Sequence, residues 1–259
     1  MPNVVTPSQL FNSRIVKIWK QYSCPLPNLS GSERFPMMLP EIGQKMRIIY
    51  SGINPSFHEP FVKSVAKTVE CPLEYFNWSR VIEESEVDRR RPQLQAFETE
   101  ARIKYTRYFR HFEKFSCDIG VSHESTTHID VLGIRATSQK QMIKTLHALR
   151  KDQQVLNFIE AQRSLYVEIL QLLSPEIVLV ANARAARWIR DDLSLIASPD
   201  KRIYRCQDVP NTTFVLSGQL GGGVTDEFAR DRLVADVKAI LKKPNGQATA
   251  ESTALQGHR

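Results

Sequence analysis

The sequence has little that would indicate a membrane-bound, secreted or metal-binding protein. No apolar stretch in its 259 residues approaches the roughly 20 residues that span a bilayer. Residues 1–13 lack the basic-then-apolar order of a signal peptide. The four cysteines, at positions 24, 71, 117 and 206, lie far apart and form no Cys-x-x-Cys pair, so no zinc or iron–sulfur site is indicated. We therefore expect reduced thiols in a cytoplasmic protein that has no membrane partner, no metal and no cofactor.

Familiar nucleotide-binding and hydrolase motifs are also missing. The glycine run at 221–223 lacks the lysine and spacing of a P-loop and is not Gly-x-Gly-x-x-Gly, which argues against nucleoside triphosphates and dinucleotides. It lies between a predicted strand and a predicted helix, so it is either a phosphate cradle of backbone N–H groups or a plain surface turn. No Gly-x-Ser-x-Gly elbow surrounds Ser217, which disfavours a Ser-His-Asp hydrolase.

The composition suits one substantial core, because 42% of the residues are hydrophobic and 24% are charged. We expect a single domain over residues 1–242, with a helical and proline-rich wrap at 1–45 and a disordered polar tail at 243–259. The net charge of +7 favours a polyanionic partner. Part of the excess lies at 88–114, where aromatic residues at helical spacing predict a buried stripe. The basic residues then form an outer face that is either solvated or in contact with phosphates.

Apolar patterns predict alternating strands and helices. The expected strands cover 46–51, 127–132, 176–181, 202–206 and 212–216. The expected helices cover 8–22, 61–69, 79–87, 93–115, 138–149, 152–173, 183–190 and 226–242. This alternation predicts an α/β fold with three layers, α/β/α, around a central, mostly parallel sheet of four to five strands.

The segment 52–55, Gly-Ile-Asn-Pro, follows the first strand and is the most informative part of the chain. Pro55 favours an extended Asn54, and Gly52 permits close approach of another group to the backbone. Sites in parallel sheets form beyond the carboxyl ends of the strands. We expect a site there, built from 52–58, 130–137, 217–225 and Asn182, which can also cap the following helix.

Together these loops resemble the uracil-DNA glycosylase superfamily over residues 46–240. The segment 52–56, Gly-Ile-Asn-Pro-Ser, is similar to the first motif of its mismatch-specific and thymine-type branch. The segments 128–135 and 217–232 are similar to those of an uncharacterised bacterial branch. The resemblance implies a parallel sheet with flanking helices, and it implies that Asn54 positions the water that attacks the sugar carbon.

Two loops depart from the family pattern. Asp130 stands where an asparagine usually contacts the base, and an ionised carboxylate accepts hydrogen bonds but donates none. The last loop lacks the histidine that stabilises the leaving base. In its place Ser217 or Gln219 would donate a hydrogen bond, and Leu220 would enter the duplex as a wedge.

The implied function is hydrolysis, without a metal, of the N-glycosidic bond of a damaged or deaminated base such as uracil, in DNA repair. A monomer would act on a duplex with a flipped base or on a single strand. Two alternatives stay open: a non-catalytic DNA-binding protein of the same fold, or a hydrolase of small nucleosides. The rings that could stack on the flipped base are those of Phe57, Tyr75, Phe76 and Trp78. The alternative for each of them is a place in the hydrophobic core. The implied site residues are Asn54, Ser217 and Gln219 for catalysis; Gly52, Ile53, Phe57, Phe76, Asp130 and Asn182 for base binding; and Ser56, His58, Leu220, Gly221 and Gly222 for DNA contact.

Overall fold

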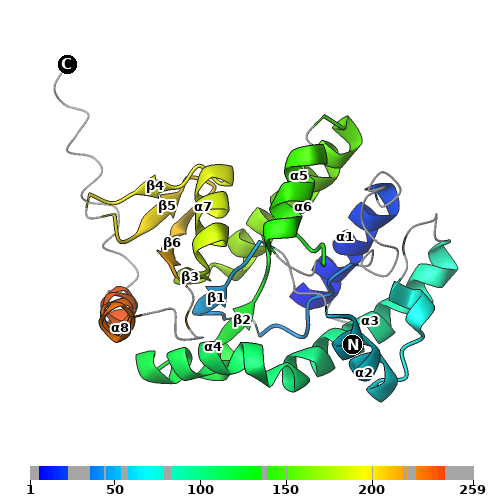
Figure 1. Cartoon of the computed structure of the whole chain (residues 1–259), viewed down its shortest axis with the longest axis horizontal. Coiled ribbons are helices and arrows are strands. Elements are labelled where there is room, and N and C mark those ends of the chain that lie inside the picture. Colours follow the sequence, from blue (N-terminus) through cyan, green and yellow to red (C-terminus); the bar gives the residue numbers. More distant parts are fainter. Residues whose placement is uncertain are drawn as a thin grey trace, which may run out of the picture.

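The computed structural model describes residues 6–22, 36–43, 45–53, 58–76, 78, 83–135, 139–149, 151–199, 201–218, 220 and 226–242. This part of the chain forms an α/β fold (Figure 1). Its strands are β1 (Ile48–Tyr50), β2 (Thr126–His128), β3 (Ile177–Ala181), β4 (Ile196–Ala197), β5 (Tyr204–Cys206) and β6 (Val209–Ser217). Its α-helices are α1 (Pro7–Tyr22), α2 (Glu59–Thr68), α3 (Glu84–Lys104), α4 (Thr106–Ile119), α5 (Gln139–Leu149), α6 (Gln153–Leu173), α7 (Ala183–Asp192) and α8 (Glu227–Lys242). Two short 3-10 helices are η2 (Leu73–Phe76) and η3 (His123–Ser125).

The strands form one mixed, six-stranded sheet in the order β2-β1-β3-β6-β5-β4. The first four strands are parallel, whereas β5 and β4 are antiparallel to their neighbours. The prediction of a mostly parallel sheet of four to five strands is therefore correct only in part, because four of the six strands are parallel and two are antiparallel. Only two residues connect β5 to β6, and so short a connection forces an antiparallel hairpin.

Helices cover both faces of the sheet. Successive buried side chains of its strands point to opposite faces and pack against different helices. Val178 and Val180 of β3 join one apolar cluster together with residues of α1, α2, α3, α6 and α7. Ile177 and Leu179 join a second cluster, which contains residues of α4 and α8. Figure 1 shows α4 and α8 below the sheet and α6 and α7 above it. This period of two is what a strand buried on both faces requires.

The helix pattern matches the prediction except around residues 79–115. Residues 79–82 lie outside the described part of the chain, and α3 passes through Pro92 instead of beginning after it. The helical run breaks instead at Tyr105, which has φ −83° and ψ 44° and separates α3 from α4. Helix α4 ends at Ile119 and is followed by Gly120, whose φ of 73° lies in the left-handed region that favours glycine.

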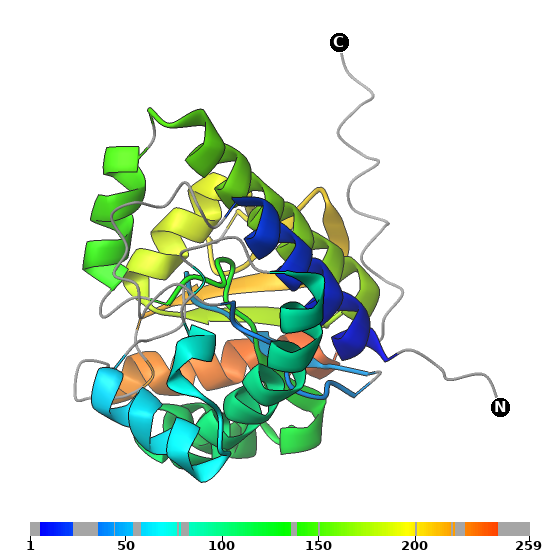
Figure 2. The same cartoon turned by 90° about the vertical axis from the view of Figure 1, so that its right-hand side faces the viewer.

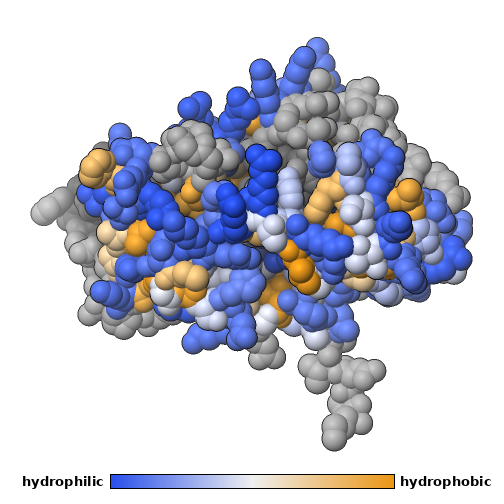
Figure 3. All heavy atoms as spheres, turned by 60° about the horizontal axis from the view of Figure 1, so that its bottom comes forward, coloured by the Kyte–Doolittle hydropathy of each residue, from blue (hydrophilic) through white to orange (hydrophobic). Residues whose placement is uncertain are grey.

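The basic residues of this region do not all lie on an outer face. Arg107, Arg110 and Lys114 of α4 are exposed, and Figure 3 shows a largely hydrophilic surface on the α4 side of the molecule. Arg90 is instead buried beside the Tyr75 and Trp78 rings and forms an ion pair with Glu86. A buried guanidinium needs such partners, and sequence periodicity does not reveal them.

Helix α1 lies along α6 and is joined to the segment 36–43 (Figure 2). The Asn12 side chain accepts a hydrogen bond from the Leu39 N–H at 2.7 Å and donates one to the Leu39 carbonyl at 2.9 Å. Ser8 donates to the carbonyl of Pro40 at 2.7 Å. The segment 36–43 of the predicted proline-rich region is thus hydrogen-bonded to α1. Residues 23–35 and the predicted tail at 243–259 lie outside the described residues.

None of the helices in the described ranges is long and apolar enough to cross a membrane.

Candidate active site

The site lies beyond the carboxyl ends of β1 and β2, where the two chains remain paired after the strands end. The N–H groups of Ile129, Val131 and Leu132 donate to the carbonyls of Tyr50, Gly52 and Ile53 at 2.9, 3.1 and 2.8 Å. The described chain after β1 therefore runs directly beside Asp130.

A small pocket, which we call the aromatic pocket, lies at this point. Its volume is about 60 Å³. Four aromatic rings and two histidines supply much of its wall, and charged side chains supply most of the rest. The lining residues are Met37, His58, Phe61, Glu98, Ala101, Arg102, Tyr105, Tyr108, Phe109, His128, Asp130 and Arg135.

Asp130 and His128 form the polar centre of the aromatic pocket. His128 is 6% exposed and the Asp130 side chain 5% exposed, and His128 Nε2 lies 3.5 Å from Asp130 Oδ1. The same nitrogen lies 3.5 Å from the Tyr108 hydroxyl. Asp130 Oδ1 and His128 Nδ1 have no hydrogen-bond partner among the described residues. A buried carboxylate with free acceptor capacity at a pocket wall is suited to bind an N–H donor.

Two arginines stand beside this centre. Arg102 of α3 reaches β2, where it donates to Thr127 Oγ1 at 3.1 Å and to the His128 carbonyl. Arg135 forms a buried ion pair with Glu98. Burial lowers the pKa of Arg102, and the nearby carboxylates of Glu98 and Asp130 act against this shift. The charges around the pocket are therefore largely balanced by one another.

Tyr108 supplies a hydroxyl that keeps its proton. The residue as a whole is 38% exposed, but its hydroxyl lies among protein groups next to His128. Burial, together with the negative charge of Asp130, raises the pKa of Tyr108 above its ordinary value of 10.0. Tyr108 can therefore donate a hydrogen bond at neutral pH, beside a carboxylate that can only accept one.

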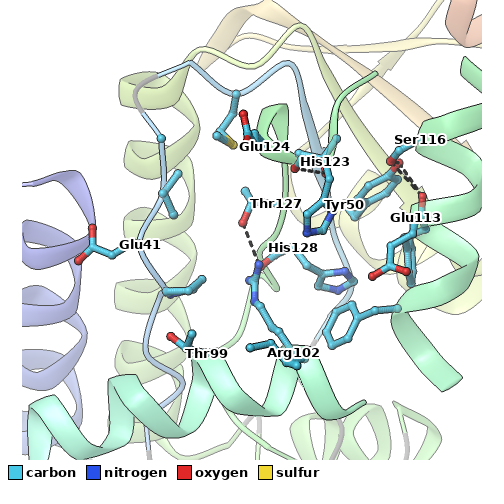
Figure 4. A pocket seen from close by; sticks show the side chains of 18 residues that line it. Glu41, Tyr50, Thr99, Arg102, Glu113, Ser116, His123, Glu124, Thr127 and His128 are labelled. Atoms are coloured by element: carbon cyan, nitrogen blue, oxygen red, sulfur yellow. Dashed lines mark hydrogen bonds between the residues drawn. The ribbon is translucent and has the colours of Figure 1, made fainter. Parts of the chain in front are cut away.

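A larger hollow, which we call the edge groove, lies along the free edge of β2 (Figure 4). Its volume is about 520 Å³, and Arg102, Phe109 and His128 line both it and the aromatic pocket. Its described lining residues include three carboxylates, Glu41, Glu113 and Glu124, against a single Lys or Arg, which is Arg102. Figure 4 shows Arg102 rising from α3 toward Thr127 and His128. This acidic lining disfavours the binding of phosphate groups in the edge groove.

Comparisons of the sequence with protein-family models and with curated proteins found no match. The chemistry of the site therefore rests on its geometry and on the motif resemblance. In the described part of the chain, no group of three or more His, Cys, Asp or Glu side chains is arranged to hold a metal ion.

The structure brings together four of the site residues expected from the sequence. Gly52 and Ile53 lie beside Asp130 through backbone hydrogen bonds, and His58 lines the aromatic pocket with Asp130. Six other expected residues lie outside the described residues: Asn54, Ser56, Phe57, Gln219, Gly221 and Gly222.

The remaining expected residues have other described surroundings. Asn182 caps α7, because its Oδ1 accepts from the N–H groups of Arg184 and Ala185 at 3.0 and 3.2 Å. Ser217 is half-buried at the end of β6. Leu220 is 7% exposed in the second apolar cluster, so a wedge role would require it to leave that cluster.

Phe76, like Tyr75 and Trp78, is buried in the first apolar cluster and does not line the aromatic pocket. Phe76 packs edge-on against Phe97, with ring centroids 4.8 Å apart. The stacking surface expected of Phe76 is therefore occupied by the core.

Several pocket residues were not expected from the sequence. His128 was not among the expected site residues, and Tyr105 and Phe109 belong to the aromatic residues at 88–114 that predicted a buried stripe, yet all three line the aromatic pocket. One signal was available for His128, because residues two apart in an extended chain share a face and Asp130 follows at that spacing. Arg102 had no such signal, since its direction depends on the break between α3 and α4.

Proposed function

We propose that the protein is a DNA glycosylase-like hydrolase that cleaves the N-glycosidic bond of a deaminated or damaged base. The observation that supports this proposal is the buried Asp130 carboxylate in the wall of an aromatic pocket, beside the chain that leads from β1 into Asn54. A flipped base needs a polar edge contact and aromatic faces, and the pocket offers both. Asn54 would orient the attacking water, as the motif resemblance implies.

The pocket suits a base edge that carries an N–H group next to a carbonyl. Asp130 would accept from the N–H, and Tyr108, which retains its proton, would donate to the carbonyl. Uracil and hypoxanthine present such an edge after deamination. Tyr108 thus supplies the donor that a carboxylate in place of the family's asparagine lacks.

Cleavage passes through a cation-like sugar while the base leaves as an anion. A neutral amide that orients water is sufficient for attack on a cation, so stabilising the departing base is the larger electrostatic task. The Arg102 guanidinium, which lies in the pocket wall, is placed to offset that charge. Exposed Arg107 and Arg110 on neighbouring α4 would contact DNA phosphates.

The proposal includes a monomer in the cytoplasm. Cys71, Cys117 and Cys206 are free thiols, which is compatible with a reducing compartment.

A hydrolase of small nucleosides is the second candidate, and the edge groove is the observation that favours it. Its volume of about 520 Å³ falls within the range of roughly 300–1,000 Å³ for small-molecule sites, and its carboxylates disfavour phosphates. An uncharged nucleoside would meet no such repulsion there. Release of free base from uridine or inosine, with no product from DNA, would favour this candidate.

The direct test uses duplex and single-stranded DNA containing uracil, hypoxanthine or a mismatch, followed by alkali to reveal abasic sites. We expect strand cleavage, reduced by orders of magnitude in Asn54→Ala and strongly reduced in Asp130→Asn. The matched controls are Asn157→Ala and Asp208→Asn, since both residues are exposed. No abasic product at enzyme excess would refute the proposal. If salt-dependent DNA binding persisted without product, the chain would be a non-catalytic DNA-binding protein.

A further inference from the structure

Behind Asp130 lies a second, smaller space, which we call the inner cavity. It has a volume of about 40 Å³ and lies between α1, α6 and the chain after β2, with Trp19, Asp130, Gln162 and Tyr166 in its lining. Three of these lining residues carry a buried polar atom that has no hydrogen-bond partner among the described residues: Trp19 Nε1, Gln162 Nε2 and Asp130 Oδ1. Trp19 is 1% exposed and Gln162 6% exposed, so both residues are buried.

The orientation of the Gln162 amide follows from its other contact. Gln162 Oε1 accepts a hydrogen bond from the Gly133 N–H at 2.8 Å. This bond assigns the oxygen and leaves the NH₂ group as the unpartnered donor. Leaving three such groups without partners would cost about 1–3 kcal/mol each, so native structures rarely do so.

We propose that the inner cavity is an internal hydration site. The indole N–H and the amide NH₂ are donors, while Asp130 is an acceptor, and water is the small molecule that satisfies both kinds of group. A cation would face two donors, an anion would face a carboxylate, and an apolar molecule would satisfy none of the three. The volume of about 40 Å³ accommodates roughly two or three water molecules.

The hydration site would position Asp130. Asp130 lines both the inner cavity and the aromatic pocket, and a carboxylate can accept several hydrogen bonds, so water in the inner cavity can donate to it while it also accepts from a ligand in the aromatic pocket. Trp19 and Gln162 hold that water and are thus positioning residues. The role toward a bound base rests on the proposed function, whereas the presence of the water does not.

The test is NMR detection of water at the tryptophan indole N–H groups. Trp78 is the internal control, because it is fully buried but donates to the Tyr75 carbonyl at 2.9 Å. We expect a direct water cross-peak for Trp19, with opposite signs in the laboratory and rotating frames, and none for Trp78. Trp19→Phe assigns the resonance. The cross-peak should persist in Tyr166→Phe, which removes a hydroxyl that could relay exchange from solvent.

A well-resolved Trp19 resonance without a water cross-peak would overturn the proposal. A second measurement uses Gln162→Glu, which keeps the acceptor for Gly133 but replaces the donor with an oxygen facing the same water as Asp130. Its thermal midpoint should fall by several degrees relative to Gln154→Glu, an exposed position on the same helix. Equal midpoints would also count against the hydration site. Neither measurement involves glycosylase activity, so each proposal can fail alone.

Discussion

The hydroxyl pair that joins the ends of β1 and β2 to α6 gives the sharpest stability prediction. Ser51 donates to the Ile129 carbonyl at 2.8 Å, and its oxygen lies 2.7 Å from the Tyr166 hydroxyl. Since the single Ser51 proton is used on Ile129, Tyr166 must donate to Ser51. Ser51 is 4% exposed and Tyr166 1% exposed, so loss of the serine leaves a buried donor without its partner.

The two single substitutions should therefore differ in cost. Tyr166→Phe removes one hydrogen bond and should lower the free energy of unfolding by about 1 kcal/mol. Ser51→Ala removes two bonds and strands the Tyr166 hydroxyl, so it should cost about 2–3 kcal/mol. The double variant has no stranded hydroxyl and should cost about 1 kcal/mol less than the sum of the two singles. The Ser51→Ala midpoint temperature would fall by roughly 4–10 °C.

Urea unfolding followed by circular dichroism measures these free energies, with the same slope expected for every variant. Ser64→Ala and Tyr22→Phe are matched controls, because Ser64 is exposed and the Tyr22 hydroxyl accepts a hydrogen bond from the side chain of exposed Gln21. Each control should change the stability by less than about 0.5 kcal/mol. The assigned hydrogen bonds from Tyr166 to Ser51 and from Ser51 to Ile129 would be refuted by two results together. These are full additivity of the two site substitutions and a loss of unfolding free energy in Ser51→Ala no larger than in its control.

Three further predictions concern other parts of the molecule. Glu98→Gln should destabilise the fold by about 3–5 kcal/mol in urea unfolding, because Arg135 loses a buried carboxylate partner. A loss below about 1 kcal/mol, as expected for an exposed ion pair, would contradict burial of the pair. Burial raises the pKa of Tyr50 to about 12 from 10.0, so the unfolded chain loses this proton first and stability should fall between pH 10 and 12. Tyr50→Phe should lose less stability than the parent over that window, and parallel pH profiles would be inconsistent with this. At pH 8 a thiol reagent should modify exposed Cys117 rapidly and Cys71 only on unfolding, since burial raises the Cys71 pKa to about 11; equal rates would rule this out.

Strong local patterns allowed most of the fold to be predicted. The uninterrupted apolar run at 176–181 contains the fully buried β3, and Asn182 caps α7 as expected. Such elements are set by the residues they contain, because burial on both faces requires apolar side chains and a helix start requires a local acceptor. These features need no knowledge of the rest of the chain.

Elements that depend on distant contacts were predicted less well. Strand β4 has two exposed residues, too few for an apolar pattern to form, so its pairing with β5 defines it. The break at Tyr105 has no glycine or proline, whereas Pro92 lies inside α3. Here tertiary packing overrides local preference, as it often does for helix propensity.

The candidate site was predictable in position but not in composition. The rule that sites lie beyond the carboxyl ends of parallel strands located Gly52 and Asp130 at one edge. It did not locate Arg102 or the rings of α4, because their placement depends on the angle between two helices. A motif on one strand thus indicates where a pocket lies, while the walls come from elsewhere in the chain.

The two ends of the sheet have a consequence for behaviour at high concentration. Exposed strand edges invite pairing with other molecules, and the described sheet ends in strands of only three and two residues, β2 and β4. On β2, the Arg102 guanidinium also binds the His128 carbonyl and places a positive charge on that edge. A substitution of Arg102 made to test the candidate site should therefore also make the β2 edge more open to pairing with another molecule.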